Sequence, residues 1–195
     1  MKLILASTSP RRRELLTLMG IPFEVIDSRV EEIAPVGVST AELVKTLALQ
    51  KARAVAVTHP NDSVIGADTV VDLDGDVLGK PHTPENAKAY LQRMQGRRHT
   101  VYTGVALLAG DREDVRFCTT DVTFAAMSED EINWYVSTGE PLDKAGAYGV
   151  QGPGGVFVEH IDGNYFNVIG MPLPLLYTML RENGILSIDH KIVGS

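Results

Sequence analysis

The chain has 195 residues, of which 44% are hydrophobic and 22% charged, a composition typical of a soluble globular protein. Its formal net charge of −7 at pH 7 argues against a general nucleic-acid-binding protein, because such proteins carry a basic face. The single cysteine, Cys118, excludes an intrachain disulfide and a CxxC metal site. The apolar run of residues 3–6 is too short for a signal peptide and no apolar run reaches about 18 residues, so we expect a cytoplasmic protein that does not enter a membrane.

Hydrophobic periodicity and capping signals predict helices and strands along the whole chain. The predicted helices cover residues 11–19, 40–57, 84–94, 129–136 and 172–182. The predicted strands cover residues 3–6, 23–26, 64–67, 70–73, 77–78, 99–108, 115–124, 156–161 and 166–169. Helices and strands alternate early, whereas long neighbouring strands dominate the middle. This order predicts a mixed α/β or α+β fold with a mixed sheet.

The first predicted helix begins with an unusual charge pattern. Ser9 is a good N-cap and Pro10 suits the first helical position. The next turn carries Arg11, Arg12 and Arg13, although the positive end of the helix dipole favours acidic residues there. A strand–loop–helix start with free backbone N–H groups is a natural phosphate site. The pattern therefore indicates capture of a phosphate or carboxylate, and the alternative is a solvated basic turn.

Two other helix starts serve as a comparison. Ser39 with Glu42 and Ser128 with Glu131 both fit the capping box, in which Glu follows the N-cap serine by three residues. Arg12 occupies the corresponding position after Ser9. The first helix start therefore departs from the purely structural pattern, and its arginines form a focused positive spot on an acidic protein.

Asp68 stands among apolar and small residues in the segment 64–71. A carboxylate at a strand end beside Gly66 suits a metal ligand or a general base, and the alternative is an ordinary turn aspartate. Asp72, Asp74 and Asp76 alternate along the following hairpin but do not match a calcium-binding loop, so we expect a solvated face there.

Two segments contain many glycines without matching a known nucleotide-binding loop. Lys80 lies between Gly79 and Pro81, one residue short of a Walker A loop, on a stiff backbone that suits a positioned cation. Residues 137–155 have no period, and loops of that length in a compact domain tend to be functional. The alternative is a flexible connector, but Tyr148 and Val150 indicate partial burial.

The sequence has no HExxH motif and no metal-ligand spacing among its histidines. It also has no GxSxG motif, so covalent nucleophilic catalysis has no strong candidate residue. Carboxylates and cations remain. The members of that set are Glu31, Glu32, Asp68, Lys51, Lys80, Arg11 and Arg12. Such a set suits metal-assisted attack of water on a phosphate better than acyl transfer.

Several ordered motifs resemble those of Maf-like nucleoside triphosphate pyrophosphatases. They are Ser7-x-Ser9-Pro10-Arg11-Arg12, Gln50-Lys51-Ala52, residues 66–69 (Gly-Ala-Asp-Thr) and Gly79-Lys80-Pro81. Residues 143–152 resemble the late loop of the dTTP/UTP-cleaving branch, and the match continues through residues 167–173. The resemblance covers roughly residues 2–186. It implies an elongated, two-lobed, inosine-triphosphatase-like fold with a mixed sheet, flanking helices and a central cleft, usually as a homodimer.

The resemblance also implies hydrolysis of dTTP, UTP or modified pyrimidine nucleotides to the monophosphate and pyrophosphate, with a divalent cation (Mg²⁺, Mn²⁺ or Co²⁺). By family match, Asp68 is the proton acceptor that activates water, and Glu32 and Asp68 bind the metal. The substrate-binding positions by the same match are Ser7, Ser9, Arg11, Arg12, Lys51, Thr69, Lys80 and Gln151. Gln151 offers both a donor and an acceptor, which suits the imide edge of uracil or thymine.

Two further expectations concern organisation and function. We expect one Maf-like domain over residues 1–186 and a polar tail over residues 187–195 that frays. The competing function is a non-catalytic nucleotide-binding regulator of cell division, which would bind nucleotide without turnover. A phosphate transferase would need an acceptor site, and nothing in the sequence indicates one.

Overall fold

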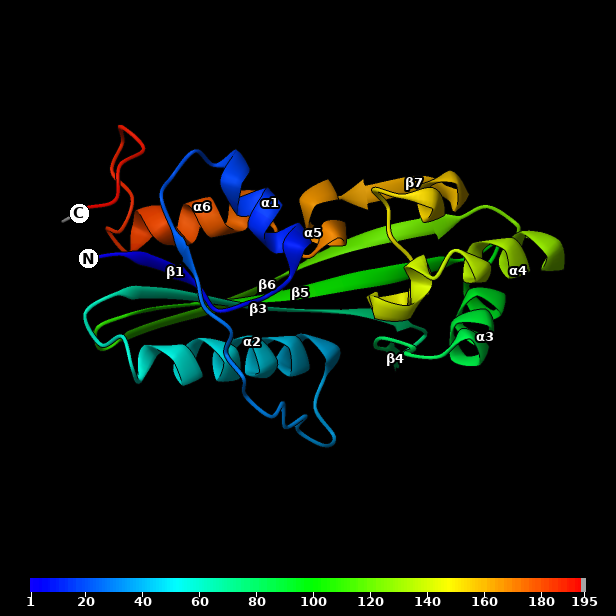
Figure 1. Cartoon of the computed structure of the whole chain (residues 1–195), viewed down its shortest axis with the longest axis horizontal. Coiled ribbons are helices and arrows are strands. Elements are labelled where there is room, and N and C mark those ends of the chain that lie inside the picture. Colours follow the sequence, from blue (N-terminus) through cyan, green and yellow to red (C-terminus); the bar gives the residue numbers. More distant parts are fainter. Residues whose placement is uncertain (194–195) are drawn as a thin grey trace. The chain divides into compact units, whose positions relative to one another are not determined.

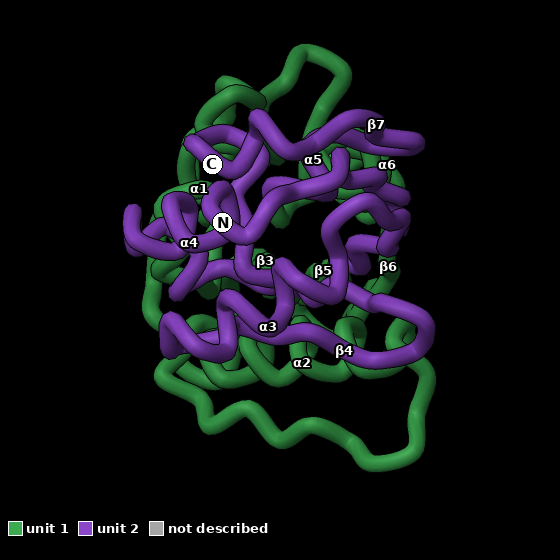
Figure 2. The backbone as a smooth tube through the Cα atoms, turned by 90° about the vertical axis from the view of Figure 1, so that its right-hand side faces the viewer, with its two compact units in different colours: residues 1–68, 103–118, 170–195 green, residues 69–102, 119–169 purple. Residues whose placement is uncertain are grey.

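A computed structural model describes residues 1–193 of the chain. The chain divides into two compact units, coloured separately in Figure 2. Unit 1 comprises Met1–Asp68, Thr103–Cys118 and the described part of Gly170–Ser195, and unit 2 comprises Thr69–Tyr102 and Thr119–Ile169. Within the described residues, no helix has both the length and the apolar character that a membrane span requires.

The strands of the described residues form one mixed sheet. They are β1 (Leu3–Leu5), β2 (Glu24–Val25), β3 (Ser63–Leu73), β4 (Asp76–Leu78), β5 (Arg98–Ala109), β6 (Arg112–Phe124) and β7 (Val158–Gly163). Their order is β2-β1-β3-β5-β6-β7, with β4 paired to β3. The pairs β1–β2 and β1–β3 are parallel, whereas β3–β4 and β6–β7 are antiparallel. The mixed α/β fold expected from the element order is confirmed.

The helices other than α5 lie close to where the capping signals place them. They are α1 (Pro10–Leu18), α2 (Thr40–Ala56), α3 (Pro84–Met94), α4 (Glu129–Ser137), α5 (Tyr165–Ile169) and α6 (Leu173–Glu182). The predicted capping box at Ser128 is complete, because the Ser128 hydroxyl accepts from the Glu131 amide and the Glu131 carboxylate accepts from the Ser128 amide. At Ser39 the hydroxyl accepts from the Glu42 amide.

Unit 1 is a three-layer arrangement. Helix α2 covers one face of the strands, and α1 and α6 cover the other (Figure 1). The α2 face is closed by a cluster of small and branched residues: Ile4, Ala6, Ala48, Ala52, Val55, Val64, Ala106 and Leu108. Small side chains on both the helix and the strands allow the two layers to approach closely.

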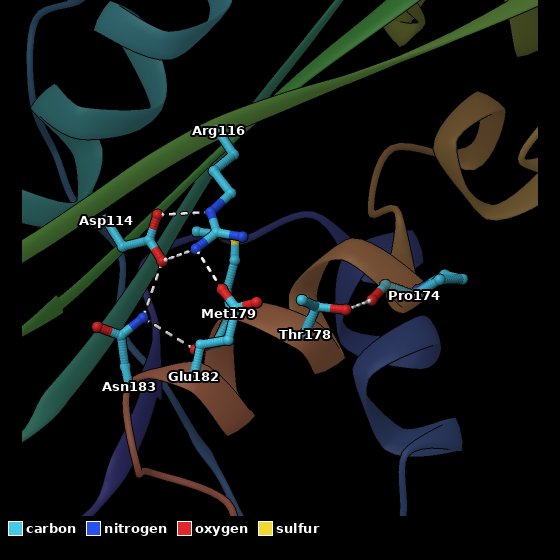
Figure 3. A network of polar contacts seen from close by, with 7 residues as sticks. All are labelled: Asp114, Arg116, Pro174, Thr178, Met179, Glu182 and Asn183. Carbon is cyan, nitrogen blue, oxygen red and sulfur yellow. Dashed lines mark hydrogen bonds and ion pairs between the residues drawn. The ribbon is translucent and has the colours of Figure 1, made fainter.

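A polar network fastens the end of α6 to β6 (Figure 3). The Arg116 guanidinium donates from Nε and Nη2 to the two Asp114 carboxylate oxygens, both at 2.8 Å, and from Nη2 to Glu182 Oε2 at 2.6 Å. The side-chain nitrogen Nδ2 of Asn183 donates to Asp114 Oδ2 at 2.8 Å and to the Met179 carbonyl at 2.9 Å. Asn183 therefore satisfies one of the carbonyl groups at the C-terminal end of the helix.

Unit 2 packs α3 and α4 against the antiparallel part of the sheet, around a core that includes Phe124, Tyr135, Tyr148 and Phe157. Residues 137–155, expected as a glycine-dense loop, contain three short 3₁₀ segments: η1 (Glu140–Asp143), η2 (Ala145–Ala147) and η3 (Pro153–Phe157). The expected burial within this loop is confirmed, because Tyr148 is buried and Val150 is half-buried.

Two predictions of local structure are wrong. Residues 166–169, expected as a strand, belong to helix α5, because the Asn164 carboxamide oxygen accepts from the Asn167 amide at 2.9 Å and begins a helical turn. The segments 64–67 and 70–73, expected as separate strands, form the single strand β3. Asp68 therefore lies within a strand, neither in a turn nor at a strand end.

The tail that we expect to fray forms backbone hydrogen bonds over residues 187–193, and residues 194 and 195 lie outside the described part of the chain. The Ser187 amide donates to the Lys191 carbonyl and the Val193 amide to the Ile185 carbonyl, both at 2.9 Å. Ile192 is buried, and the His190 ring stacks on Tyr177 of α6. Apolar residues within a mostly polar segment thus hold this turn against the helix.

A buried histidine lies in the core of unit 2. His99 Nε2 and the Tyr148 hydroxyl are 2.9 Å apart, and the imidazole packs edge-on against the rings of Phe124 and Tyr148. Its Nδ1 has no hydrogen-bond partner within residues 1–193. Burial lowers the pKa of His99 from its ordinary 6.5 to about 4, against the opposing effect of the Asp121 charge. The folded protein therefore holds this side chain neutral down to mildly acidic pH.

This burial predicts a loss of stability in acid. Between pH 6.5 and about 4 the unfolded chain binds a proton at His99 that the folded chain does not bind. The free energy of unfolding should fall by up to about 3 kcal/mol from this group as the pH decreases through that interval. Urea unfolding at several pH values would show a flatter dependence in His99→Gln than in the exposed control His160→Gln. Equal slopes in the two variants would contradict the prediction.

Candidate active site

The turn between β1 and α1 places three of the predicted substrate-binding residues together. The Ser7 hydroxyl accepts from the Ser9 amide at 3.3 Å and from Arg12 Nη1 at 3.4 Å. The Ser9 hydroxyl accepts from the Arg12 amide at 3.5 Å, so Ser9 is the N-cap as expected. Arg12 Nε donates to the Gly170 carbonyl at 2.9 Å. These contacts direct the Arg12 side chain back over the first turn of α1.

Three charged side chains, those of Asp68, Glu32 and Arg11, lie close enough to Arg12 to affect its pKa. Burial lowers the pKa of Arg12, the negative charges of Asp68 and Glu32 oppose that shift, and the positive charge of Arg11 adds to it. The position of Arg12 in the first helix turn thus has a physical account. Arg12 faces two carboxylates of unit 1, and these offset the unfavourable position of its charge at the N-terminal end of a helix.

Helix α2 lies in direct contact with β3 at Gly66. A Cβ atom at this position would lie 2.2 Å from the Ala48 carbonyl oxygen and 2.8 Å from the Ala52 amide nitrogen. A second contact of the same kind occurs at Gly104 of β5, where a Cβ atom would lie 2.2 Å from the Val44 carbonyl oxygen. Only glycine allows these approaches. Lys51 of α2 is thereby brought against Asp68, two residues after Gly66.

Lys51, Asp68 and Glu32 form the charged centre of unit 1. Lys51 Nζ lies 2.6 Å from Asp68 Oδ1 and 3.0 Å from Glu32 Oε1. The Lys51 and Asp68 side chains are only 12% and 11% exposed, whereas that of Glu32 is 46% exposed. The pairing supplies the compensation that a nearly buried carboxylate needs. It explains why Asp68 is tolerated inside a strand.

Two carboxylates converging on one ammonium also suit a divalent cation. Within residues 1–193, no group of three His, Cys, Asp or Glu side chains is arranged as a complete metal cage. Mg²⁺ is commonly bound by one or two carboxylates together with substrate phosphates. The donor set of Glu32 and Asp68 therefore fits a cation that arrives with a phosphate ligand.

Sequence reasoning gave no separate role to Gln50, which fixes the segment that carries Glu32. Gln50 Oε1 accepts from the Ile33 amide at 3.0 Å, and Gln50 Nε2 donates to the Ile33 carbonyl at 2.9 Å. The two bonds hold the residue next to Glu32 against α2. Gln50 directly precedes Lys51, so the sequence signal was its place in the Gln50-Lys51-Ala52 motif.

The remaining predicted site residues lie in unit 2. Thr69 is half-buried and follows Asp68 in β3, whereas Lys80 and Gln151 are exposed. The Gly146 amide donates to the Gly79 carbonyl at 3.1 Å, so the segment that carries Lys80 is attached to the glycine-dense loop that carries Gln151. Their roles toward a substrate stay predictions.

A family model described as Maf-like protein matches residues 2–183. The chain belongs to the Maf-like family. It is 50% identical over 181 residues to a dTTP/UTP pyrophosphatase of Bacillus cytotoxicus, covering 93% of this chain and 95% of that protein. It is 53% identical over 183 residues to a dTTP/UTP pyrophosphatase of Symbiobacterium thermophilum, covering 94% of each.

Solved structures support the fold of this Maf-like chain. The Ham1 protein of Staphylococcus aureus aligns with a TM-score of 0.55 at 16% identity, over 94% of this chain and all of that one. A HAM1 protein from Coxiella burnetii aligns with a TM-score of 0.54, also at 16% identity, over 93% of this chain and 99% of that one. At this identity the likeness concerns the fold alone.

The contact at Gly66 generates a prediction. Gly66→Ala would force α2 away from β3, because the new methyl group would overlap backbone atoms of the helix. We expect a loss of about 1–3 kcal/mol in the free energy of unfolding, as for other overpacked sites, together with reduced turnover as Lys51 moves from Asp68. Urea unfolding would measure the loss. Gly79→Ala is the stability control, because a methyl group added there would meet open space. A Gly66→Ala protein of unchanged stability would contradict this account.

Proposed function

We propose that this Maf-like protein hydrolyses dTTP and UTP to the nucleoside monophosphate and pyrophosphate. The observation that carries the proposal is the nearly buried Asp68–Lys51 pair, with Glu32 and Arg12 beside it, at the phosphate-type helix start of unit 1. The names of relatives about 50% identical over nearly the whole chain support the same activity and the same two substrates.

In the proposed reaction, water attacks the α-phosphorus and the bond from that phosphorus to the α–β bridging oxygen breaks, so that pyrophosphate leaves. Lys51 bonds to Oδ1 of Asp68, and we assign Oδ2 to accept the proton of the attacking water. Arg11, Arg12, Lys51 and Lys80 would neutralise the charge of the triphosphate. The Ser7 and Ser9 hydroxyls and Thr69 would supply further hydrogen bonds to the substrate.

Glu32 and Asp68 would hold a divalent cation, Mg²⁺, Mn²⁺ or Co²⁺. When bound, the cation would polarise the phosphate oxygens and neutralise developing charge. Lys51 would then exchange part of its contact with the carboxylates for a phosphate oxygen. In this scheme one ammonium satisfies the carboxylates in the free protein and binds the substrate in the complex.

The base would be recognised by Gln151, whose carboxamide can donate to a carbonyl oxygen and accept from the imide N–H of uracil or thymine. The thymine methyl group needs only a small apolar space, so both bases, and modified pyrimidines of similar size, should be accepted. By the same family resemblance we propose a homodimer that does not act on nucleic acid.

The experiment that tests the proposal is a product assay with the common and several modified nucleoside triphosphates and each divalent cation, separating pyrophosphate from orthophosphate. We expect pyrophosphate from dTTP and UTP, little from purine nucleotides, and none in excess chelator. Nucleotide binding without turnover under every condition would contradict the proposal and indicate the nucleotide-binding regulator instead.

Asp68→Asn tests the assigned proton acceptor. Loss of the basic oxygen should lower kcat by about a hundredfold to ten-thousandfold, the usual contribution of a general base, while nucleotide binding persists. Single-turnover kinetics and equilibrium titration would measure the two effects separately. Asp72→Asn in the same strand is the matched control, because its carboxylate accepts from the Gly75 amide in the hairpin and an amide oxygen can do the same. A wild-type rate in Asp68→Asn would remove Asp68 from this role.

A further inference from the structure

The glycine-dense loop of unit 2 is organised around two side chains that the proposed reaction does not use. Glu140 Oε2 accepts from the Tyr135 hydroxyl at 2.7 Å and from the Gly154 amide at 3.0 Å. The Tyr135 hydroxyl accepts in turn from the Gly149 amide at 3.1 Å. The Glu140 carboxylate and the Tyr135 phenol thus connect the end of α4 to the loop backbone at Gly149 and at Gly154.

The glycines of the loop are needed for these side chains to approach. A Cβ atom at Gly152 would lie 1.9 Å from Glu140 Oε1, and one at Gly154 would lie 2.2 Å from the Tyr135 hydroxyl oxygen. At Gly149 a Cβ atom would lie 2.8 Å from Cε of Lys144 and 3.2 Å from Glu140 Oε1. The loop backbone therefore wraps directly around the Glu140 carboxylate, and the glycine content follows from this contact.

The bonding pattern suits a charged acceptor beside a neutral phenol. Burial, and after it the hydrogen bond to Glu140, raise the pKa of Tyr135, so that its hydroxyl stays protonated and donates. Lys144 Nζ donates to the Glu140 backbone carbonyl at 3.0 Å and to Asp143 Oδ1 at 2.8 Å, which fixes the start of the loop. Hydrogen bonds to a charged group inside a protein are stronger than those between neutral groups.

Gln151 lies within this arrangement but does not take part in it. Residue 151 is exposed, whereas Gly149 is packed against Lys144 and Glu140, and Gly152 against Glu140. We propose that Glu140, acting with Tyr135, is the positioning residue that holds Gln151 in the orientation needed to read the base. This inference rests on the proposed role of Gln151 in binding the base. It adds the residue that makes the choice of base by Gln151 selective.

Direct contact of Glu140 with the nucleotide is the less favoured interpretation. One carboxylate oxygen is committed to two donors, and the other lies against the backbone of Gly152. A carboxylate would also repel a polyphosphate. Glu140 therefore acts through the loop, and its effect should appear in the choice of base.

The test compares the ratio of kcat/KM for dTTP to kcat/KM for CTP across a series of variants and one control. The series begins with Gln151→Ala, Glu140→Ala, Glu140→Gln, Tyr135→Phe and the double variant Glu140→Ala/Gln151→Ala. Gln151→Ala should lower the ratio by about tenfold, the equivalent of one good hydrogen bond. Glu140→Ala should lower it by a similar factor, and the double variant should be no less selective than Gln151→Ala alone, because the two residues act as one unit.

Glu140→Gln should restore most of the selectivity, because its amide oxygen can accept from both Tyr135 and Gly154. Glu159→Ala, an exposed glutamate of β7, is the matched control and should keep the wild-type ratio. Tyr135→Phe keeps the buried ring and removes only the hydroxyl, so it carries the test if Glu140→Ala fails to fold. Its ratio should fall, and adding Gln151→Ala to it should produce no loss beyond that of Gln151→Ala.

The possible outcomes distinguish failure of the positioning role of Glu140 from failure of the proposed hydrolysis. Wild-type selectivity in both Glu140→Ala and Tyr135→Phe, or losses that multiply with that of Gln151→Ala, would overturn the positioning role while pyrophosphate release stands. An unchanged ratio in Gln151→Ala would remove Gln151 from base recognition and the positioning role with it. Absence of pyrophosphate release from the wild-type protein would instead overturn the proposed function.

Discussion

The close approach of α2 to the sheet at Gly66 is the contact on which the charged centre of unit 1 depends. A helix can approach a strand more closely where the strand residue has no Cβ atom. Here α2 makes such close contacts with β3 at Gly66 and with β5 at Gly104. The result is that Lys51 reaches Asp68 at 2.6 Å. Without this approach the carboxylate would be buried in a strand without a partner, at a cost of several kcal/mol.

The same centre accounts for the position of Arg12 at the start of α1. Helix dipoles disfavour cations at that end, yet Arg12 is directed back over the turn, where Ser7 and the Gly170 carbonyl bind it. Its charge faces Glu32 and Asp68, and Gln50 holds the segment of Glu32 in place through Ile33. Cations and carboxylates thus offset each other in the free protein, and in the proposed function the same groups would bind a phosphate and its metal ion.

Unit 2 contains a long glycine-dense loop that has little intrinsic preference for any one backbone conformation. Glycine raises the entropy lost on folding, so a glycine-dense segment needs specific contacts to adopt one conformation. Glu140 and Tyr135 supply them by binding the backbone at Gly149 and Gly154. In the proposed positioning role, these contacts hold the exposed Gln151, which lies between those points, in a defined orientation.

Features that arise from local interactions could be predicted from the amino-acid sequence alone. Caps and periodicity placed the helices, including α3 at its observed bounds, because a helix start depends on residues three or four positions apart. Ordered motifs identified the family and predicted the site residues, of which Lys51, Asp68 and Arg12 lie near one another in unit 1. Long-range packing decided that β3 continues through Asp68, that Gly170 and Gln50 bind Arg12 and the segment of Glu32, and that Glu140 binds the glycine-dense loop. Those outcomes depend on partners distant in the chain, such as Arg12 with Gly170, 158 residues apart, which no local pattern reveals.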